Sequence, residues 1–435
     1  MILNRGHAAT TSEPTNGTLA SAYEETRSLT EQLCIPLAIE DYGVQSMPDA
    51  SPAKWHLAHT TWFFETFILT ENDPSYRLFH PQFGIMFNSY YNAVGPFWPR
   101  SQRGILSRPT VAEVYRYREH VDRGMRRLLH DGGPATAEIC ERFVLGVNHE
   151  QQHQELLLTD LKHAFASNPL RPSYHESRPR PAQSLLSQQW IDYPGGLCWV
   201  GHDGADFAYD NEMPTHRVFL DPFQLASRLV TCDDYHSFID DGGYQRPELW
   251  LSEGWATCRA HGWQAPLYWE QQDGAWYNMT LSGWQPVRDA DPVCHVSFFE
   301  ADAYARWAGA RLPTEFEWET SARECPLEGP FLDVNLLHPQ PHHDGTADRR
   351  CPAQMFGNVW QWTSSAYLGY PGYRPLPGAL GEYNGKFMSN QMVLRGGSCA
   401  TPRSHFRRTY RNFFPPHVRW QFTGIRLAKD SSAIN

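Results

Sequence analysis

The sequence predicts an α+β protein in which an N-terminal four-helix bundle precedes a second, irregular α+β domain. Residues 17–166 carry apolar side chains at the spacing of amphipathic helices. Residues 167–187 are rich in Pro, Arg and Ser and have no periodicity, which predicts a linker. Residues 188–430 consist of short apolar stretches interrupted by Gly, Pro, Asn and Asp, a pattern typical of short strands joined by ordered loops.

Capping signals place the helices of the first domain. The first helix is expected from about Leu19 to Leu37, and the second begins at Ser51-Pro52 and runs to Leu69. The third starts at Thr110, the first residue of a capping box, and the fourth follows residues 132–134 (Gly-Gly-Pro) and ends near 165. Four such helices make a bundle. The second domain offers only two brief helices, at 231–240 and 298–307.

Composition and charge exclude several classes of partner. The chain has 435 residues, a formal net charge of -11 and no block of Lys or Arg, so we expect no nucleic-acid partner. It has no apolar run of membrane-spanning length and no leader-like N-terminus, so we expect a cytoplasmic protein without a membrane partner. Nine cysteines without a CxxC spacing favour reduced thiols, with a disulfide among the later ones left open.

Three histidines form a candidate metal site. His149 and His153 are four residues apart, which places them on one face of a helix, although such a pair also occurs on solvated polar faces. His59 lies among aromatic residues on the buried side of another helix, where an unpaired imidazole costs roughly 1–3 kcal/mol. A metal shared by the three would supply its partner. Neutral imidazoles suit zinc or iron(II), and His56 is expected to be an ordinary core histidine bonded to a carbonyl.

Two sets of motifs resemble one known family. The segment Ser51–Thr60 (SPAKWHLAHT) and the segment His149–Glu155 (HEQQHQE) resemble the DinB-like domain of ergothioneine-biosynthesis sulfoxide synthases. The motifs at 211–216, 310–319, 357–363 and 394–398 resemble the formylglycine-generating-enzyme fold, which is distantly C-type-lectin-like. Together they cover nearly the whole chain. The resemblance implies a DinB-like bundle at 17–166, a linker at 167–187 and a formylglycine-generating-enzyme-like domain at 188–430.

The resemblance also implies the chemistry. Members of this family are iron(II)-dependent oxidoreductases, and the match places Fe(II) on His59, His149 and His153. With O2 the enzyme would join the imidazole ring of trimethylhistidine (hercynine) to the thiol of cysteine or γ-glutamylcysteine and yield a sulfoxide. Tyr90 and Tyr91 resemble the tandem tyrosines of one subgroup, in which a phenol near the iron serves the oxygen chemistry; a structural role is the alternative for either ring.

Other residues match substrate-binding positions of the family. Gln152 corresponds to the glutamine that touches the substrate imidazole, and Asn412 to the residue that holds the betaine end. Phe413 and Phe414 stand where the better-known subgroup has Trp-Asp, and the loss of the acid favours free cysteine as the sulfur donor. Because the metal and tyrosine candidates come from the first domain and Asn412 from the second, we expect the pocket at the seam between them.

Two arginines are further candidates from the residues themselves. Arg100 and Arg103 precede the third helix and could bind the cysteine carboxylate through forked hydrogen bonds, although surface arginines are common.

Other functions remain as alternatives. A zinc-dependent DinB-type thiol transferase would also use three histidines, but it does not explain the long second domain. An ovothiol-type synthase acting on histidine and cysteine usually carries a methyltransferase domain, and no glycine-rich nucleotide loop follows Arg426. Formylglycine generation is disfavoured because Thr401 and Phe406 occupy the positions of its cysteine pair. A lectin-like protein that only binds a ligand would not need stoichiometric iron.

Overall fold

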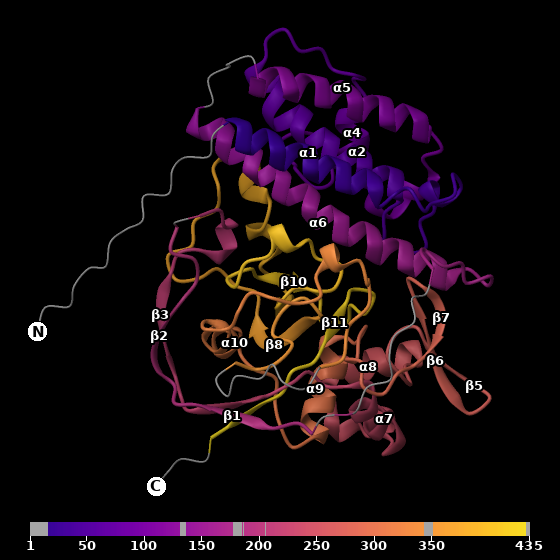
Figure 1. Ribbon diagram of the computed structural model, residues 1–435, viewed down its shortest axis with the longest axis vertical. Helices are drawn as coiled ribbons and strands as arrows, with labels where there is room; N and C mark the ends of the chain where they lie inside the picture. Colours follow the sequence, from indigo (N-terminus) through magenta and orange to yellow (C-terminus); the bar gives the residue numbers. More distant parts are fainter. Residues whose placement is uncertain are drawn as a thin grey trace, which may run out of the picture.

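The computed structural model describes residues 16–130, 136–176, 185, 187–204, 206–342 and 351–431. Figure 1 shows the helices of the N-terminal half at one end of the molecule and the strands at the other, with α6 (Ala137–Ser167) along the boundary between them. The predicted α+β class, with a helical N-terminal part and a second part that contains the sheets, is therefore confirmed. The Gly-Gly-Pro turn at 132–134 and most of the second half of the predicted linker lie outside the described residues.

Four main helices form the first half, as expected. They are α1 (Asn16–Gln32), α2 (Ala53–Phe64), α5 (Val111–His130) and α6. The first ends five residues earlier than predicted, and Pro52 caps α2 from just outside it. A π-helix (Glu65–Leu69) and α3 (Thr70–Asn72) extend α2, while α4 (Phe83–Phe87) and two 3-10 helices (Asp41–Gly43, Arg100–Ile105) lie in the connections. The capping box at Thr110 is present, with Glu113 Oε2 2.7 Å from the Thr110 amide.

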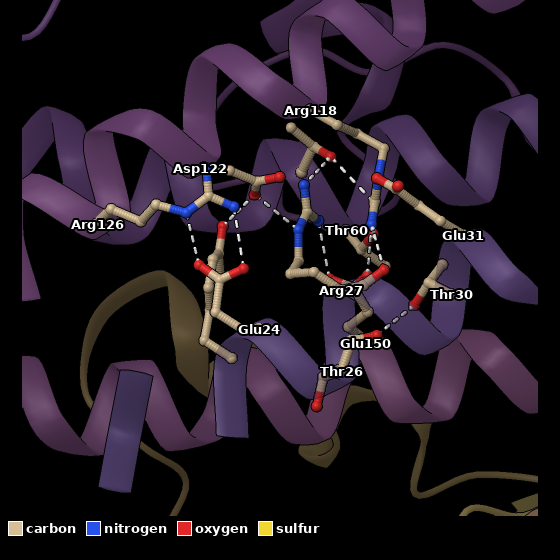
Figure 2. Close-up of polar contacts among 12 residues, drawn as sticks. Glu24, Thr26, Arg27, Thr30, Glu31, Thr60, Arg118, Asp122, Arg126 and Glu150 are labelled. Atoms are coloured by element: carbon tan, nitrogen blue, oxygen red, sulfur yellow. Dashed lines mark hydrogen bonds and ion pairs between the residues drawn. The ribbon is translucent and has the colours of Figure 1, made fainter. Parts of the chain in front are cut away.

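A buried charge network joins α1, α5 and α6 (Figure 2). Arg27 donates to Asp122 at 2.9 Å and to Glu150 at 2.8 Å. Arg118 donates to the other Glu150 oxygen at 3.1 Å, so this one carboxylate lies between two buried guanidinium groups. Because buried charges are retained only when they are paired, this network fixes how the three helices pack. It therefore also fixes the orientation of α6, which carries His149 next to Glu150.

The described residues of the second half form four small sheets and four α-helices. The sheets have the strand orders β1-β4-β12, β10-β9-β8-β11, β2-β3 and β5-β6-β7. The strands are β1 (Trp190–Tyr193), β2 (Gly196–Val200), β3 (His216–Leu220), β4 (Phe223–Ala226), β5 (Trp269–Gln272), β6 (Ala275–Thr280), β7 (Gly283–Pro286), β8 (Trp360–Ala366), β9 (Met392–Arg395), β10 (Asn412–Phe414), β11 (Thr423–Gly424) and β12 (Ala428–Asp430). Each neighbouring pair is antiparallel except β11 with β8.

Both helices predicted in the second half are present. They are α7 (Cys232–Asp240) and α9 (Phe298–Trp307), each with a capping box that starts at the preceding Thr231 or Ser297. Two further helices were not predicted, α8 (Ser252–His261) and α10 (Glu315–Ala322). The second of these has its own capping box at Thr314, a signal that was present in the sequence. Short 3-10 turns connect the remaining segments.

The segment after α6 packs between the two halves. Tyr174, within the predicted linker, is buried, and its hydroxyl donates to the Leu33 carbonyl at 2.7 Å. Its backbone amide donates to the Leu281 carbonyl at 2.8 Å. One side of this residue thus contacts the helical half and the other contacts the second half, so this part of the segment is anchored rather than a free spacer.

Cys325 and Cys351 form a disulfide, which is the possibility that the sequence left open among the later cysteines. Their sequence separation of 26 gave no local signal, because only tertiary packing brings the two Cα atoms to 5.3 Å. Cys34, Cys258, Cys294 and Cys399 are buried free thiols. None of the described helices is both long enough and apolar enough to cross a membrane.

Candidate metal centre at the domain seam

The three candidate histidines come together. His59 lies on α2, and His149 and His153 lie one turn apart on α6. Each histidine offers one ring nitrogen to the site, and these three nitrogens lie within 4.8 Å of one another. His59 Nε2 is 3.2 Å from His149 Nε2. Two nitrogens bound to one zinc or iron ion at about 2.0–2.1 Å would be roughly 3.0–3.4 Å apart. The spacing therefore fits a shared ion, without deciding which metal it is.

The outer nitrogens of two histidines are held by a defined chain of partners. His59 Nδ1 lies 2.6 Å from the Phe87 carbonyl, which can only accept, so Nδ1 carries the proton and Nε2 keeps its lone pair. His153 Nδ1 lies 2.9 Å from His56 Nδ1, and His56 Nε2 lies 3.1 Å from the Asp160 carboxylate. With the Asp160 carboxylate accepting from His56, His56 Nδ1 accepts from His153. His153 then presents the lone pair of Nε2.

His56 therefore has a different role from the one predicted. It was expected to bond to a carbonyl, but its ring bridges His153 and Asp160 instead. Asp160 is held in turn by the Ser51 amide, 2.8 Å away, which belongs to the turn that starts α2. Sequence reasoning missed this pair. The signal was the spacing, since Asp160 lies seven residues after His153 and thus on the same side of α6.

Aromatic rings enclose the histidines. Trp55 and Trp62 stack on His59, with centroid distances of 4.5 and 5.6 Å, and Phe63 lies 4.7 Å from His149. Burial lowers the pKa of His149 to about 3 and also lowers the pKa values of His59 and His153 well below the ordinary value. All three rings are thus neutral at pH 7. The buried Nδ1 of His149 has no hydrogen-bond partner among the described residues. This donor set fits a metal ion.

The tandem tyrosines lie beside this cluster. The rings of Tyr90 and Tyr91 stack with a centroid distance of 4.7 Å, and Tyr91 also contacts Trp62, the ring that stacks on His59. Tyr91 is completely buried, and its hydroxyl has no hydrogen-bond partner among the described residues. Burial raises the pKa of both phenols, so each keeps its proton at neutral pH.

The two candidate arginines differ in their surroundings. Arg103 is 3% exposed, and its guanidinium lies 3.4 Å from the centre of the Trp55 ring. It donates to Ser51 Oγ at 2.9 Å and to Ser89 Oγ at 3.0 Å, while its buried Nε has no partner among the described residues. Arg100 is exposed and donates to the Asp49 carbonyl. Only Arg103 is thus placed close to the histidine cluster.

Gln152 connects the two halves at the site. Its amide nitrogen donates to the Tyr410 hydroxyl at 2.6 Å, and its carbonyl oxygen accepts from the Tyr383 hydroxyl. The Tyr383 ring also lies 5.6 Å from His149. Neither tyrosine was predicted. Tyr410 stands two residues before Asn412 and could have been found from that motif, whereas Tyr383 lies in a loop without any motif.

Asn412, Phe413 and Phe414 form β10, which pairs with β9. Asn412 Oδ1 accepts from the Phe413 amide at 2.9 Å. The Phe413 ring stacks on Tyr367 at 3.9 Å and lies 6.0 Å from Phe387, which in turn meets Tyr90 edge-on. Among the described residues, Phe413 is thus linked to Tyr90 through the Phe387 ring.

Comparisons with known proteins agree on both halves. Residues 22–157 match the DinB superfamily, and residues 175–348 and 352–431 match the sulfatase-modifying factor enzyme 1-like domain. The chain is 33% identical over 412 residues to a hercynine oxygenase of Mycolicibacterium thermoresistibile, covering 88% of each protein. It is 32% identical over 408 residues to a hercynine oxygenase of Mycobacterium tuberculosis, covering 88% of this chain and 92% of the relative. A formylglycine-generating enzyme of Thermomonospora curvata is 30% identical, over 60% of this chain and 99% of its own length.

Proposed function

The chain belongs to the hercynine oxygenase family, and from this premise we propose that it is a sulfoxide synthase of ergothioneine biosynthesis. It joins the imidazole carbon of trimethylhistidine (hercynine) to the sulfur of cysteine. One carbon–hydrogen bond, one thiol and O2 give a carbon–sulfur bond with a sulfoxide oxygen, and the second oxygen leaves as water. The observation that carries the proposal is the convergence of His59, His149 and His153 at the seam.

Iron(II) is the metal we propose for this centre. Three neutral imidazoles would hold it and leave positions for substrates and O2. A ferrous ion would activate O2 there, which zinc, lacking redox chemistry, does not do. The Phe87 carbonyl and the His56–Asp160 pair keep the rings of His59 and His153 in the orientation that such a site needs. A cytoplasmic location would keep the thiol substrate reduced.

Arg103 is the best candidate to bind the carboxylate of cysteine. A buried guanidinium is costly to leave without a negative partner, and its two hydrogen bonds go to neutral hydroxyl groups. Stacking on Trp55, which itself stacks on His59, holds it one ring away from the histidines. A cysteine whose carboxylate is bound there would have its thiol directed towards the metal centre. Arg100, on the surface, is the weaker candidate of the two.

Gln152 is proposed to orient the substrate imidazole. Tyr383 and Tyr410 fix its amide from both sides, so the side chain can offer hydrogen bonds in only one orientation. Asn412 is proposed to hold the betaine end of the substrate. Phe413 and Phe414 supply no carboxylate at the neighbouring positions, which favours free cysteine over γ-glutamylcysteine. Tyr90 and Tyr91 are the proposed proton donors, because both phenols keep their protons at neutral pH.

The test is O2 consumption by protein reconstituted anaerobically with iron(II). We expect rapid consumption only when trimethylhistidine and a thiol are both present, and a sulfoxide product identified by mass spectrometry. Cysteine and γ-glutamylcysteine offered together should give mainly the cysteine product, while histidine in place of trimethylhistidine tests the ovothiol-type alternative. Equal turnover by the zinc-loaded protein would contradict the proposal.

A further inference from the structure

Two loops from different halves of the chain meet beside the metal centre. The tandem-tyrosine turn comprises residues 88–95 and carries Tyr90 and Tyr91. The Tyr383 loop comprises residues 378–387 and contains the 3-10 helices Gly378–Glu382 and Gly385–Phe387. Each loop contributes rings to the site, since Tyr91 contacts Trp62 and Tyr383 contacts His149.

One carboxylate holds these two loops together. Glu382 accepts hydrogen bonds from the Asn92 amide at 3.1 Å, from Asn92 Nδ2 at 3.2 Å and from the Ala93 amide at 2.8 Å. These donors follow Tyr91 directly in the chain. The carboxylate accepts hydrogen bonds from two adjacent backbone amides and so binds the backbone of the turn. This contact therefore does not depend on the side chains around it.

A lysine completes the contact. Lys386 lies four residues after Glu382, in the next 3-10 helix, and pairs with it at 2.8 Å. It also donates to the Tyr90 carbonyl, and its ammonium group lies 4.8 Å from the centre of the Tyr90 ring. Phe387, the next residue, meets Tyr90 edge-on at 5.2 Å. The Tyr383 loop therefore contacts both the backbone of the tandem-tyrosine turn and the ring of Tyr90.

The turn also has hydrogen bonds of its own, including those from the Val94 and Gly95 amides to the Tyr91 carbonyl at 3.1 and 3.3 Å. Asn88 organises it from one side, accepting from the Tyr91 amide at 3.0 Å and donating to the Tyr91 carbonyl at 3.0 Å. Glu382, which lies 290 residues after Asn92 in the chain, accepts the hydrogen bonds of the Asn92 and Ala93 amides. The hydrogen bonds of Glu382 lower the pKa of its carboxyl group to about 2 in spite of partial burial, so it is ionised throughout the neutral range.

We propose that Glu382 is a positioning residue that fixes the tandem-tyrosine turn against the Tyr383 loop. It thereby sets the ratio between two reactions that consume the thiol, sulfoxide formation and oxidation to a sulfinic acid. This inference rests on the proposed function. In the productive reaction the thiol and the imidazole carbon share the four-electron reduction of O2. In the competing one the sulfur supplies all four electrons and takes both oxygen atoms, so that a thiol and O2 give a sulfinic acid. A phenol held at the right distance favours the first.

The first measurement is hydrogen exchange of the peptide that contains residues 88–95. Glu382→Gln keeps the shape of the side chain but turns an amide NH2 towards donors, so we expect exchange of this peptide to be about tenfold faster. Asp302→Asn is the matched control, because Asp302 forms an i,i+4 pair with Arg306 and its side chain is 20% exposed, the same fraction as that of Glu382. It should leave this peptide unchanged. Equal exchange in wild type and Glu382→Gln would overturn the proposal.

The second measurement is the ratio of sulfoxide to sulfinic acid, determined by mass spectrometry. We expect Glu382→Gln to lower it about tenfold, Lys386→Gln to lower it less, and Asp302→Asn to leave it unchanged. Faster exchange with an unchanged ratio would show that the contact does not position the tyrosines and would overturn the inference. A wild-type protein that forms no sulfoxide would overturn the proposed function and the division of thiol with it, whereas the exchange rates would still decide whether Glu382 holds the turn.

Discussion

Tyr90 and Tyr91 differ in what their hydroxyl groups can do. Tyr91 is completely buried and contacts Trp62 and Phe67, while Tyr90 is partly exposed and borders the Tyr383 loop. Replacement of either tyrosine by Phe removes one hydroxyl and keeps the ring. We expect Tyr91→Phe to lower the ratio of sulfoxide to oxidised thiol by about 100-fold, within the range of general-acid effects, and Tyr90→Phe to lower it less. Mass spectrometry of both products measures it.

Tyr235→Phe is a suitable control for this residue. Tyr235 is a buried tyrosine of α7, and its hydroxyl lies 3.0 Å from that of Tyr244, inside the second half of the chain. Its loss should affect stability and leave the product ratio as it is. If both Tyr90→Phe and Tyr91→Phe gave the wild-type ratio, neither phenol would take part in the reaction.

At the scale of the elements, Glu150 decides how α6 packs against α1 and α5 (Figure 2). It is 0% exposed and pairs with both Arg27 and Arg118. Glu150→Gln would leave these two guanidinium groups without a full counter-charge, and breaking a buried ion pair costs about 3–5 kcal/mol. We expect a decrease of that size in the free energy of unfolding of the protein, measured by urea denaturation at pH 7.

The pair of Glu24 and Arg126, also drawn in Figure 2, provides the control. Glu24 and Arg126 also pair, but both side chains are nearly half exposed, so Glu24→Gln should cost less than about 1 kcal/mol. Burial opposes ionisation of Glu150, but Arg27 and Arg118 lower its pKa below the ordinary value. Its contribution is therefore complete above about pH 4.3 and is lost as the pH falls through the lower folded-state pKa. Equal losses in the two variants, or wild-type acid sensitivity in Glu150→Gln, would contradict this account.

At the scale of the whole molecule, Glu155 joins the two halves. This buried residue of α6 accepts from Trp360 Nε1 at 2.8 Å, from Ser398 Oγ at 2.5 Å and from Thr401 Oγ1 at 2.7 Å. All three donors belong to the second half of the chain. Glu155→Ala would leave three buried donors without an acceptor. We expect its calorimetric unfolding to separate into two transitions, because the halves would no longer unfold together.

Glu65→Ala is the corresponding control within one half. Glu65 is also buried and accepts from the Tyr76 and Tyr117 hydroxyls, both of which belong to the helical half. This variant should lower the unfolding temperature without separating the transitions. An unchanged single transition in Glu155→Ala would show that other contacts hold the seam.

The sequence by itself determined what local rules govern. The helices with capping signals, the two-part architecture and the shared helix face of His149 and His153 follow from spacings of a few residues. The meeting of His59 with that pair was predicted from its buried position, which needed a partner, and from the family resemblance.

Tertiary structure alone decided the contacts between distant residues. The His56–Asp160 support, the Cys325–Cys351 disulfide, the burial of Tyr174 between the halves and the approach of Tyr383 to His149 each join segments without a shared local pattern. The physical reason is that chain entropy opposes each such contact singly, and the packing of the whole core makes all of them favourable together. Only the folded molecule therefore shows which partners a side chain has.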